Sequence, residues 1–233
     1  MQLASPRVVK EILASHSIKP SRGLGQNFLI DSNIVKKLTA AANIEPADTV
    51  LEIGPGIGTL TQELASRAKK VIAVEKDKNL VRVSEGLTVG MKNIEVIHAD
   101  ILKLNLPRIP TLQHSYKVVA NLPYYITAPT IRKFLETERQ PRSLTLIVQK
   151  EVAQRICAKP PEMSILAVSV QVYAVPKIIA YIRKTSFWPQ PKVDAAILQI
   201  TPLAQPYPID FPKFFTIAKA GFKQPRKQLV NNL

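Results

Sequence analysis

A glycine-rich turn and a later carboxylate are the first residues whose types and spacing indicate chemistry. Residues 49–53 are a short apolar run that predicts a buried strand, and GPGIG follows directly at 54–58. The next apolar run, 71–74, ends in Glu75, which lies 21 residues beyond Gly54. A glycine turn between a strand and a helix lets a ligand approach the backbone, and a carboxylate after the second strand can bind a ribose. The pattern predicts a site for a nucleotide-type cofactor.

The spacing of the glycines fits two kinds of ligand. Enzymes that bind NAD use G-x-G-x-x-G, whereas this chain has G-x-G-x-G followed by Thr59. On spacing alone we favour S-adenosylmethionine over a dinucleotide. A glycine turn that binds nothing is the third alternative.

A second group of residues, Asn121-Leu122-Pro123-Tyr124, follows the apolar run 118–120. The Asn121 side-chain oxygen and a backbone carbonyl near Pro123 can accept the two protons of an exocyclic amine on a base. Proline fixes that carbonyl and adds no competing donor, and Tyr124 offers a flat face for stacking. The alternative is an ordinary turn after a strand. Behind a cofactor-type glycine turn, we favour the amine site.

These residues require a sheet whose strand ends meet at one edge. We expect strands at 94–97, 144–148, 178–182 and 195–200, the last two as a hairpin-like pair with one antiparallel strand. We expect helices at 6–15, 60–68, 128–136 and 150–157, one ending near 87, and one from a cap at Asp31 or Ser32. Residues 163–173 fit a strand or a helix. The proline-rich stretch 202–212 predicts a linker before a basic helical segment, 214–233.

The chain resembles the rRNA adenine N6,N6-dimethyltransferases, in the same order and over essentially its whole length. The similar segments are GLGQNFLID at 23–31, VLEIGPGIGTLT at 50–61, VIAVEKD at 71–77, HADIL at 98–102, NLPYYI at 121–126 and FWPQPKVDAA at 187–196. One departure is KPPE at 159–162, which stands where the family has a longer glycine-containing loop.

The resemblance implies an α/β, Rossmann-like class I methyltransferase fold with a mostly parallel seven-stranded sheet. It places a methyltransferase domain at 1–203 and the start of a small all-helical RNA-binding domain at 204–233. It implies transfer of methyl groups from S-adenosylmethionine to N6 of two adjacent adenines near the 3′ end of small-subunit rRNA. Because the family's helical domain continues beyond this point, we interpret 204–233 as incomplete, from a truncated chain or an unusually short member.

The resemblance also implies roles for individual residues. The catalytic residues would be Asn121, Pro123, Tyr124 and Phe187, with Phe187 stacking on the target base opposite Tyr124. The cofactor-binding residues would be Gln26, Asn27, Leu29, Gly54, Gly56, Gly58, Glu75, Lys76, Asp100, Ile101 and Asn121. Asp100 follows a predicted strand, where it can accept a hydrogen bond from the adenine amine of the cofactor. We reject His98 as a catalytic base, because it precedes the strand end and because transfer from a sulfonium does not require a strong base.

The charge of the chain is concentrated in its second half. Residues 1–102 contain 13 Lys/Arg and 11 Asp/Glu, a net charge of +2, whereas residues 103–233 contain 19 and 6, a net charge of +13. This asymmetry predicts a polyanionic partner, and a cationic surface that only aids solubility is the alternative. The candidate RNA contacts are Lys19, Arg22, Arg132, Lys133, Lys223, Arg226 and Lys227. Another adenine N6-methyltransferase, or a non-catalytic RNA-binding assembly factor, remains an alternative function.

Several classes of protein are disfavoured. No apolar run reaches the roughly 18 residues of a membrane span, and the N-terminus lacks the apolar region of a secretory signal. The one cysteine, Cys157, indicates a reducing compartment, and no histidines and carboxylates have metal-ligand spacing. We therefore expect a cytoplasmic, metal-free monomer that acts on small-subunit rRNA or an immature small ribosomal subunit.

Overall fold

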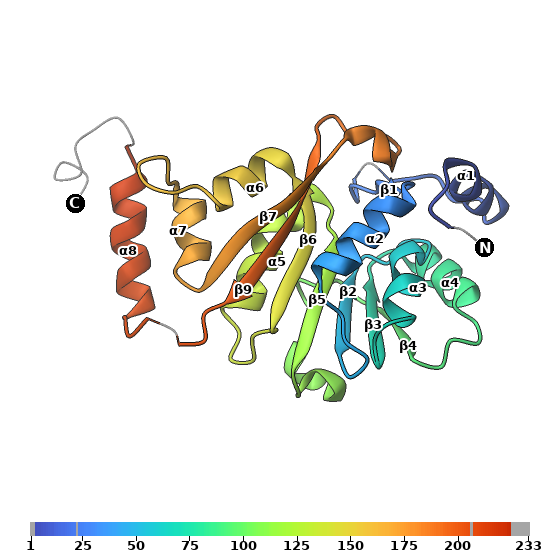
Figure 1. Cartoon of the computed structure of the whole chain (residues 1–233), viewed down its shortest axis with the longest axis horizontal. Helices are drawn as coiled ribbons and strands as arrows, with labels where there is room; N and C mark the ends of the chain where they lie inside the picture. Colours follow the sequence, from blue (N-terminus) through green and yellow to red (C-terminus); the bar gives the residue numbers. More distant parts are fainter. Residues whose placement is uncertain (1–2, 22, 206, 225–233) are drawn as a thin grey trace.

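A computed structural model of the protein describes residues 3–21, 23–205 and 207–224. Its centre is a seven-stranded sheet in the order β4-β3-β2-β5-β6-β9-β7 (Figure 1). The strands are β2 (Thr49–Ile53), β3 (Lys70–Glu75), β4 (Ile94–His98), β5 (Tyr116–Asn121), β6 (Ser143–Gln149), β7 (Ala174–Ile182) and β9 (Ala195–Pro202). Strands β2 to β6 run parallel, and β9 runs antiparallel to both β6 and β7. The predicted sheet is confirmed, including its one antiparallel strand.

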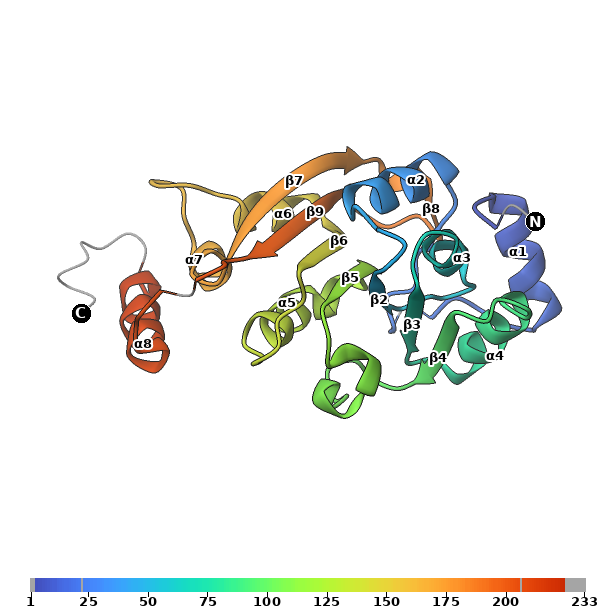
Figure 2. The same cartoon turned by 60° about the horizontal axis from the view of Figure 1, so that its bottom comes forward.

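Helices cover both faces of the sheet, so the central strands are buried on each side and their sequences are almost continuously apolar. Helices α2 (Ser32–Ala41) and α3 (Thr59–Ala65) pack on one face, and α5 (Thr127–Leu135), α6 (Lys150–Ile156) and α7 (Ile165–Gln171) pack on the other. At the β4 end, α1 (Pro6–Ser15) and α4 (Lys78–Leu87) lie side by side (Figure 2). The core is therefore a three-layer α/β arrangement.

Some predicted boundaries were wrong. Helix α3 ends at Ala65, before the predicted end at residue 68. Segment 163–173, which fits a strand or a helix by sequence, contains helix α7; Ser164 caps this helix by accepting a hydrogen bond from the Ala167 amide. Helix α8 (Phe211–Phe222) begins inside the stretch predicted as a linker, because Pro212 occupies its first turn, where proline is tolerated. Three-residue helical turns, η1 (Leu106–Arg108), η2 (Pro110–Leu112), η3 (Tyr124–Ile126) and η4 (Lys184–Ser186), occupy connections between the larger elements.

A second, two-stranded sheet was not predicted. Strand β1 (Phe28–Leu29) pairs antiparallel with β8 (Phe187–Trp188), so Phe28 lies opposite Trp188 and Leu29 opposite Phe187. The pair brings the segment before α2 next to the segment between β7 and β9. We call this pair the β1–β8 ribbon.

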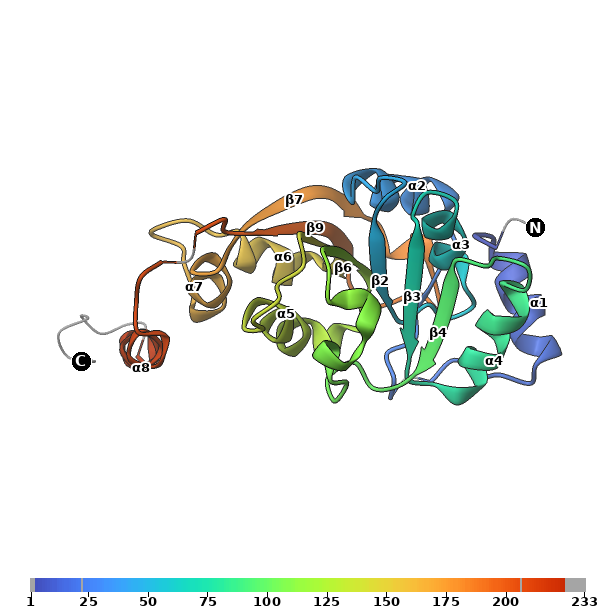
Figure 3. The same ribbon diagram turned by 90° about the horizontal axis from the view of Figure 1, so that it is seen from below.

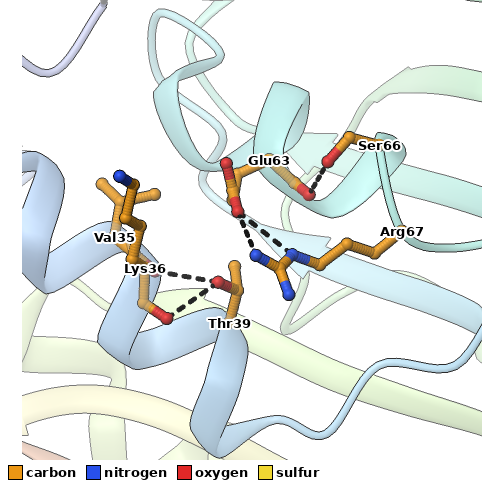
Figure 4. Close-up of polar contacts among 6 residues, drawn as sticks. All are labelled: Val35, Lys36, Thr39, Glu63, Ser66 and Arg67. Atoms are coloured by element: carbon orange, nitrogen blue, oxygen red, sulfur yellow. Dashed lines mark hydrogen bonds and ion pairs between the residues drawn. The ribbon is translucent and has the colours of Figure 1, made fainter.

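The contact between α2 and α3 is apolar. Several polar side chains beside it form hydrogen bonds or ion pairs within their own segments (Figure 4). The buried Thr39 hydroxyl donates to the carbonyl oxygens of Val35 (3.2 Å) and Lys36 (3.0 Å) in α2. Arg67 Nη2 lies 2.6 Å from the carboxylate of Glu63, four residues earlier. The helices can thus pack together without leaving these polar groups unpaired.

Helix α8 lies at the β7 end of the molecule, beside α7 (Figure 3). None of its residues is buried, and its contact depends on aromatic rings: the Phe211 and Phe215 centroids lie 4.6 Å and 6.1 Å from that of Tyr173. Within the part of the chain that the structure describes, no helix is both long enough and apolar enough to cross a membrane.

A buried ion pair joins the amino ends of the central strands. Lys117 in β5 donates from Nζ to Asp48 Oδ2 at 2.7 Å and to the carbonyl of Asn43, and both charged side chains are only 8% exposed. Asp48 Oδ2 also accepts from the Glu45 amide at 2.8 Å. These bonds compensate for removing the two charges from water.

We predict that Asp48→Ala lowers the free energy of unfolding by about 3–5 kcal/mol, because it leaves the Lys117 ammonium buried without its anion. The double variant Asp48→Ala/Lys117→Met should lose less, because the unpaired charge is gone. Urea denaturation measures both. Glu63→Ala is the control, since it breaks a partly exposed helical pair worth less than about 1 kcal/mol. A loss for Asp48→Ala no larger than that of the control would contradict the prediction.

Candidate active site

The glycine turn connects β2 to α3 in a conformation that needs glycine. Gly54, Gly56 and Gly58 all have positive φ, at 69°, 60° and 83°. A Cβ on Gly56 would lie 3.2 Å from the Phe28 ring, so β1 packs directly on the turn. The turn therefore presents bare backbone at the carboxyl edge of the sheet.

Glu75 anchors this turn from the neighbouring strand. Its side chain is buried at the end of β3; Oε2 accepts from the Gly56 amide at 3.1 Å, and Oε1 accepts from the Lys76 and Asp77 amides at 2.8 and 2.9 Å. Burial raises the pKa of Glu75, and the three backbone hydrogen bonds oppose that rise. A carboxylate has about four acceptor positions, so Glu75 keeps capacity for a ligand hydroxyl.

Asp100 lies two residues beyond β4 and forms an ion pair with Lys76. Lys76 Nζ is 3.0 Å from Asp100 Oδ2, and Oδ1 accepts from the Leu102 amide at 2.9 Å. The hydrogen bond from Lys76 lowers the pKa of Asp100, so this carboxylate is ionised at neutral pH. The His98 ring instead bonds to the Lys76 carbonyl at 3.2 Å, and His98 does not line the cavity described below.

Residues 24–29 cover the glycine turn and are held at two points. Gln26 Nε2 donates to Asp77 Oδ2 at 2.9 Å, and Asn121 Nδ2 donates to the Asn27 carbonyl at 2.9 Å. Asp77 also caps α4 by accepting from the Asn79 amide. We call residues 24–29 the cover segment.

Asn121 ends β5, and its bond to the cover segment orients its amide. Because Nδ2 is used by Asn27, the side-chain oxygen is the group left to accept a hydrogen bond from a ligand. The Pro123 carbonyl already accepts from the Ile126 amide at 3.1 Å, in turn η3, so it has one lone pair left. Burial, with a smaller effect from Asp194, raises the pKa of Tyr124 to about 12, so its phenol stays neutral.

One cavity brings almost all the predicted catalytic and cofactor residues together. Its lining includes Gln26, Asn27, Leu29, Gly54, Gly56, Glu75, Lys76, Asp100, Ile101, Asn121, Pro123, Tyr124 and Phe187. Phe187 is only 3% exposed, so a base must enter the cavity to contact it. Gly58 does not line the cavity: it is the N-cap of α3, and a Cβ there would approach Ser84 in α4 and Thr88 at the C-cap of α4. Its position reflects helix packing, which a glycine count cannot distinguish from ligand contact.

Glu52 also lines the cavity, and sequence reasoning missed it. It is 1% exposed within β2, and neither carboxylate oxygen has a hydrogen-bond partner among the described residues. Burial raises its pKa to about 8, and the nearby Thr61 hydroxyl opposes only part of the rise. The signal was available, because an acidic residue interrupts an otherwise apolar strand just before the glycine turn. A cationic ligand would supply the partner that Glu52 lacks.

The predicted RNA-contact residues differ in how exposed and how free their charged groups are. Lys133 does not offer a free ammonium, because its Nζ donates to the carbonyls of Leu102 (3.1 Å) and Leu104 (2.7 Å), and burial lowers its pKa. Arg132 is exposed but pairs with Glu136 and lies beside α7 and α8, outside the cavity lining. Lys19 and Lys223 are exposed. Arg22, Arg226 and Lys227 lie outside the described residues.

The fold and the cavity define a class I S-adenosylmethionine-dependent methyltransferase. The bare glycine turn, the carboxylates after β3 and β4 and the unpartnered Glu52 fit a cofactor with a ribose, an adenine and a cationic amino acid end. A model of the family described as ribosomal RNA adenine dimethylase matches residues 15–233. The chain belongs to this family.

Individual relatives agree with the family. The ribosomal RNA small subunit methyltransferase A of Dehalococcoides mccartyi strain CBDB1 is 43% identical over 229 residues, covering 96% of this chain and 78% of that protein. The crystal structure of a dimethyladenosine transferase from Plasmodium falciparum superposes with a TM-score of 0.78 at 30% identity, covering 87% of this chain and 73% of that one. The 23S rRNA methyltransferase ErmE superposes with a TM-score of 0.76 at 28% identity, with coverage of 88% and 83%.

We predict that Glu52→Gln stabilises the cofactor-free protein increasingly as pH rises. The unfolded chain ionises Glu52 near the usual 4.5, whereas the folded chain holds the proton until about 8, so the wild type loses stability across that window. The difference should reach on the order of 4 kcal/mol at pH 8 and nearly vanish at pH 4. Urea denaturation at several pH values measures it. Parallel pH profiles for the two proteins would contradict the assignment.

The same variant should bind S-adenosylmethionine about tenfold more weakly or worse, because an amide replaces the charged partner of the cationic ligand. Calorimetric titration at pH 8 measures this affinity. An unchanged affinity would show that Glu52 does not face the ligand.

Proposed function

We propose that this chain transfers methyl groups from S-adenosylmethionine to N6 of two adjacent adenines near the 3′ end of small-subunit rRNA, as part of small-subunit biogenesis. Membership of the ribosomal RNA adenine dimethylase family supports the reaction, and the name of the Dehalococcoides relative supports the small subunit as its target. The Asn121 amide carries the proposal, because its orientation at the cavity suits an amine with two protons to donate.

Different residues of the cavity would bind different parts of S-adenosylmethionine. The glycine turn and Glu75 would hold the ribose end of the cofactor, Asp100 its adenine amine and Glu52 its ammonium. When bound, S-adenosylmethionine supplies a methyl group on a positively charged sulfur. Asn27 and Leu29 of the cover segment, which line the cavity, would close it over the cofactor. Lys76 keeps Asp100 ionised, so that this carboxylate accepts hydrogen bonds and does not donate them.

The target adenine must leave its stack to enter the cavity. Tyr124 and Phe187 would then flank the base and replace the lost stacking. The exocyclic amine is a poor nucleophile, because its lone pair is delocalised into the ring. Asn121 Oδ1 and the second lone pair of the Pro123 carbonyl would accept its protons and favour a pyramidal nitrogen, with its lone pair directed at the methyl carbon. The methyl group would pass to this nitrogen as the S–C bond breaks, the rest of the cofactor would leave as a neutral thioether, and the nitrogen would lose its surplus proton to solvent.

Catalysis in this scheme comes from positioning and from fixed dipoles, not from an acid or a base. The neutral Tyr124 phenol and the position of His98 outside the cavity lining are consistent with it. The sulfonium already carries the positive charge, so the reaction requires no metal ion. We also propose that the enzyme acts as a monomer, in the cytoplasm.

We propose residues 1–203 as the methyltransferase domain and 204–233 as the start of a helical RNA-binding domain. The absence of buried residues in α8 supports this division. The net charge of +13 over residues 103–233 supports an RNA partner, either rRNA or an immature small ribosomal subunit. Lys19, Arg132 and Lys223 remain candidate phosphate contacts, because all three are exposed.

The direct test is to incubate the protein with S-adenosylmethionine labelled on its methyl group and four separate substrates: naked small-subunit rRNA, immature small subunits, large-subunit rRNA and DNA. We expect label in small-subunit RNA, recovered as N6,N6-dimethyladenosine at two adjacent positions. Label confined to large-subunit rRNA would favour the activity named for ErmE. No label in any substrate would overturn the proposal.

We predict that Asn121→Ala cuts turnover by about 10²-fold or more, because the lost interaction strengthens as the transition state forms. Cofactor affinity should change less than about tenfold, since only the one hydrogen bond to the cover segment is lost. Single-turnover methylation and calorimetric titration separate the two effects. Equal turnover in the variant and the wild type would make Asn121 a structural residue only.

A further inference from the structure

A group of exposed basic and aromatic side chains lies at the carboxyl edge of the sheet, beyond the residues considered so far. We call Lys150, Tyr181, Arg183 and Lys184 the β7 rim. All four are exposed, and Tyr181 is 55% exposed. No step of the mechanism above uses them.

The strand register places the β7 rim at the level of the active site. Asn121 lies opposite Ile147 across β5 and β6, Gln149 lies opposite Ala195 across β6 and β9, and Ala195 lies opposite Ile182 across β9 and β7. The end of β7 and the start of α6 therefore reach the same edge of the sheet as Asn121. In Figure 1 this edge carries the β1–β8 ribbon as well.

Asp194 lies between the β7 rim and the target-base site. The backbone amide of Lys150 donates to the Asp194 carbonyl at 3.0 Å, and the backbone amide of Lys184 donates to Asp194 Oδ1 at 2.9 Å. The Asp194 carboxylate is close enough to Tyr124 to contribute to the raised pKa of that phenol. Turn η4, which begins at Lys184, leads directly into Phe187 on the cavity wall. The β7 rim thus borders the place where the target base would enter.

The side chains of the β7 rim suit a single nucleic acid strand. Lys150 Nζ lies 5.1 Å from the centroid of the Tyr181 ring, which places a cation beside an exposed aromatic side chain. Proteins that bind single strands combine cations that follow the phosphates with aromatic rings on which bases stack.

We propose that the β7 rim binds the single-stranded RNA beside the flipped adenine, with phosphates on Lys150, Arg183 and Lys184 and a flanking base on Tyr181. The inference rests on the proposed RNA substrate and adds to it a surface for the neighbouring nucleotides. Two adjacent target adenines require that one is held outside the cavity while the other reacts. Tyr181 offers a stacking face for that neighbour.

The test uses the full chain, a short single-stranded RNA with two adjacent adenines, and a binding assay at several salt concentrations. Tyr181→Ala should weaken RNA binding by about 5- to 150-fold, the range for losing one stacked base, and Tyr181→Phe should restore most of it. Arg183→Ala/Lys184→Ala should reduce the slope of log affinity against log salt by about 1.4, since each lost phosphate contact accounts for about 0.7. In methylation assays the KM for RNA should rise while kcat changes little.

A control lies at the opposite edge of the sheet, outside the proposed RNA-binding domain. Lys69 is exposed just before β3. Lys69→Ala should leave RNA binding unchanged. Melting temperature and cofactor affinity should match the wild type in every variant, which separates loss of RNA contact from loss of folding.

The other outcomes would contradict either the proposed role of the β7 rim or the proposed function on which that role rests. In one of them, the wild type binds and methylates the RNA while the rim variants keep the same RNA affinity and salt slope. That result would overturn RNA binding by the β7 rim and leave the proposed function intact. Loss of activity only on assembled subunits, with naked RNA bound normally, would assign the surface to a ribosomal protein and also overturn it. A wild type that neither binds nor methylates RNA would overturn the proposed function itself.

Discussion

One buried carboxylate holds the active edge of this sheet together. Glu75 accepts hydrogen bonds from the Gly56, Lys76 and Asp77 amides, so the turn after β2 and the turn after β3 share one anchor. A carboxylate removed from water needs such donors, and backbone amides near an ionised oxygen form stronger bonds than neutral pairs do. Asp77, fixed by the same arrangement, caps α4 and binds Gln26 of the cover segment. The glycine turn, α4 and the cover segment therefore depend on Glu75.

Much of this edge follows from the sequence because the relevant signals are local. Buried parallel strands read as continuous apolar runs, and the residue that ends each run falls at the carboxyl edge. The amino-acid sequence alone is thus enough to place Gly54, Glu75 and Asn121 together, since the topology brings the ends of β2, β3 and β5 side by side. The apolar runs also predicted the strands of the sheet, including one antiparallel strand. The reaction was predicted from the family resemblance.

What the sequence could not predict depends on contacts between distant segments. Lys133 has the composition of a phosphate contact, but its ammonium is bound by carbonyls some 30 residues away, at Leu102 and Leu104. Glu52 stands out in its apolar run, but its complete burial and its lack of a hydrogen-bond partner among the described residues depend on the layers above and below β2. The β1–β8 ribbon joins two residues near position 28 with two near 187, a pairing too short to leave a periodic pattern.

The β1–β8 ribbon has a thermodynamic consequence. Its first strand contains Leu29 of the cover segment, and its second contains Phe187, opposite Leu29 in register. A movement of the cover segment would therefore be transmitted through this pairing to Phe187, the ring proposed to flank the target base. Ligands that share a structural element in this way are coupled, and the coupling is reciprocal: the factor by which bound cofactor tightens RNA is the factor by which RNA tightens the cofactor. Between the first and second methyl transfers, the enzyme must release the spent cofactor but keep the singly modified RNA. Because both ligands would be coupled through the β1–β8 ribbon, loss of the cofactor would also weaken RNA binding.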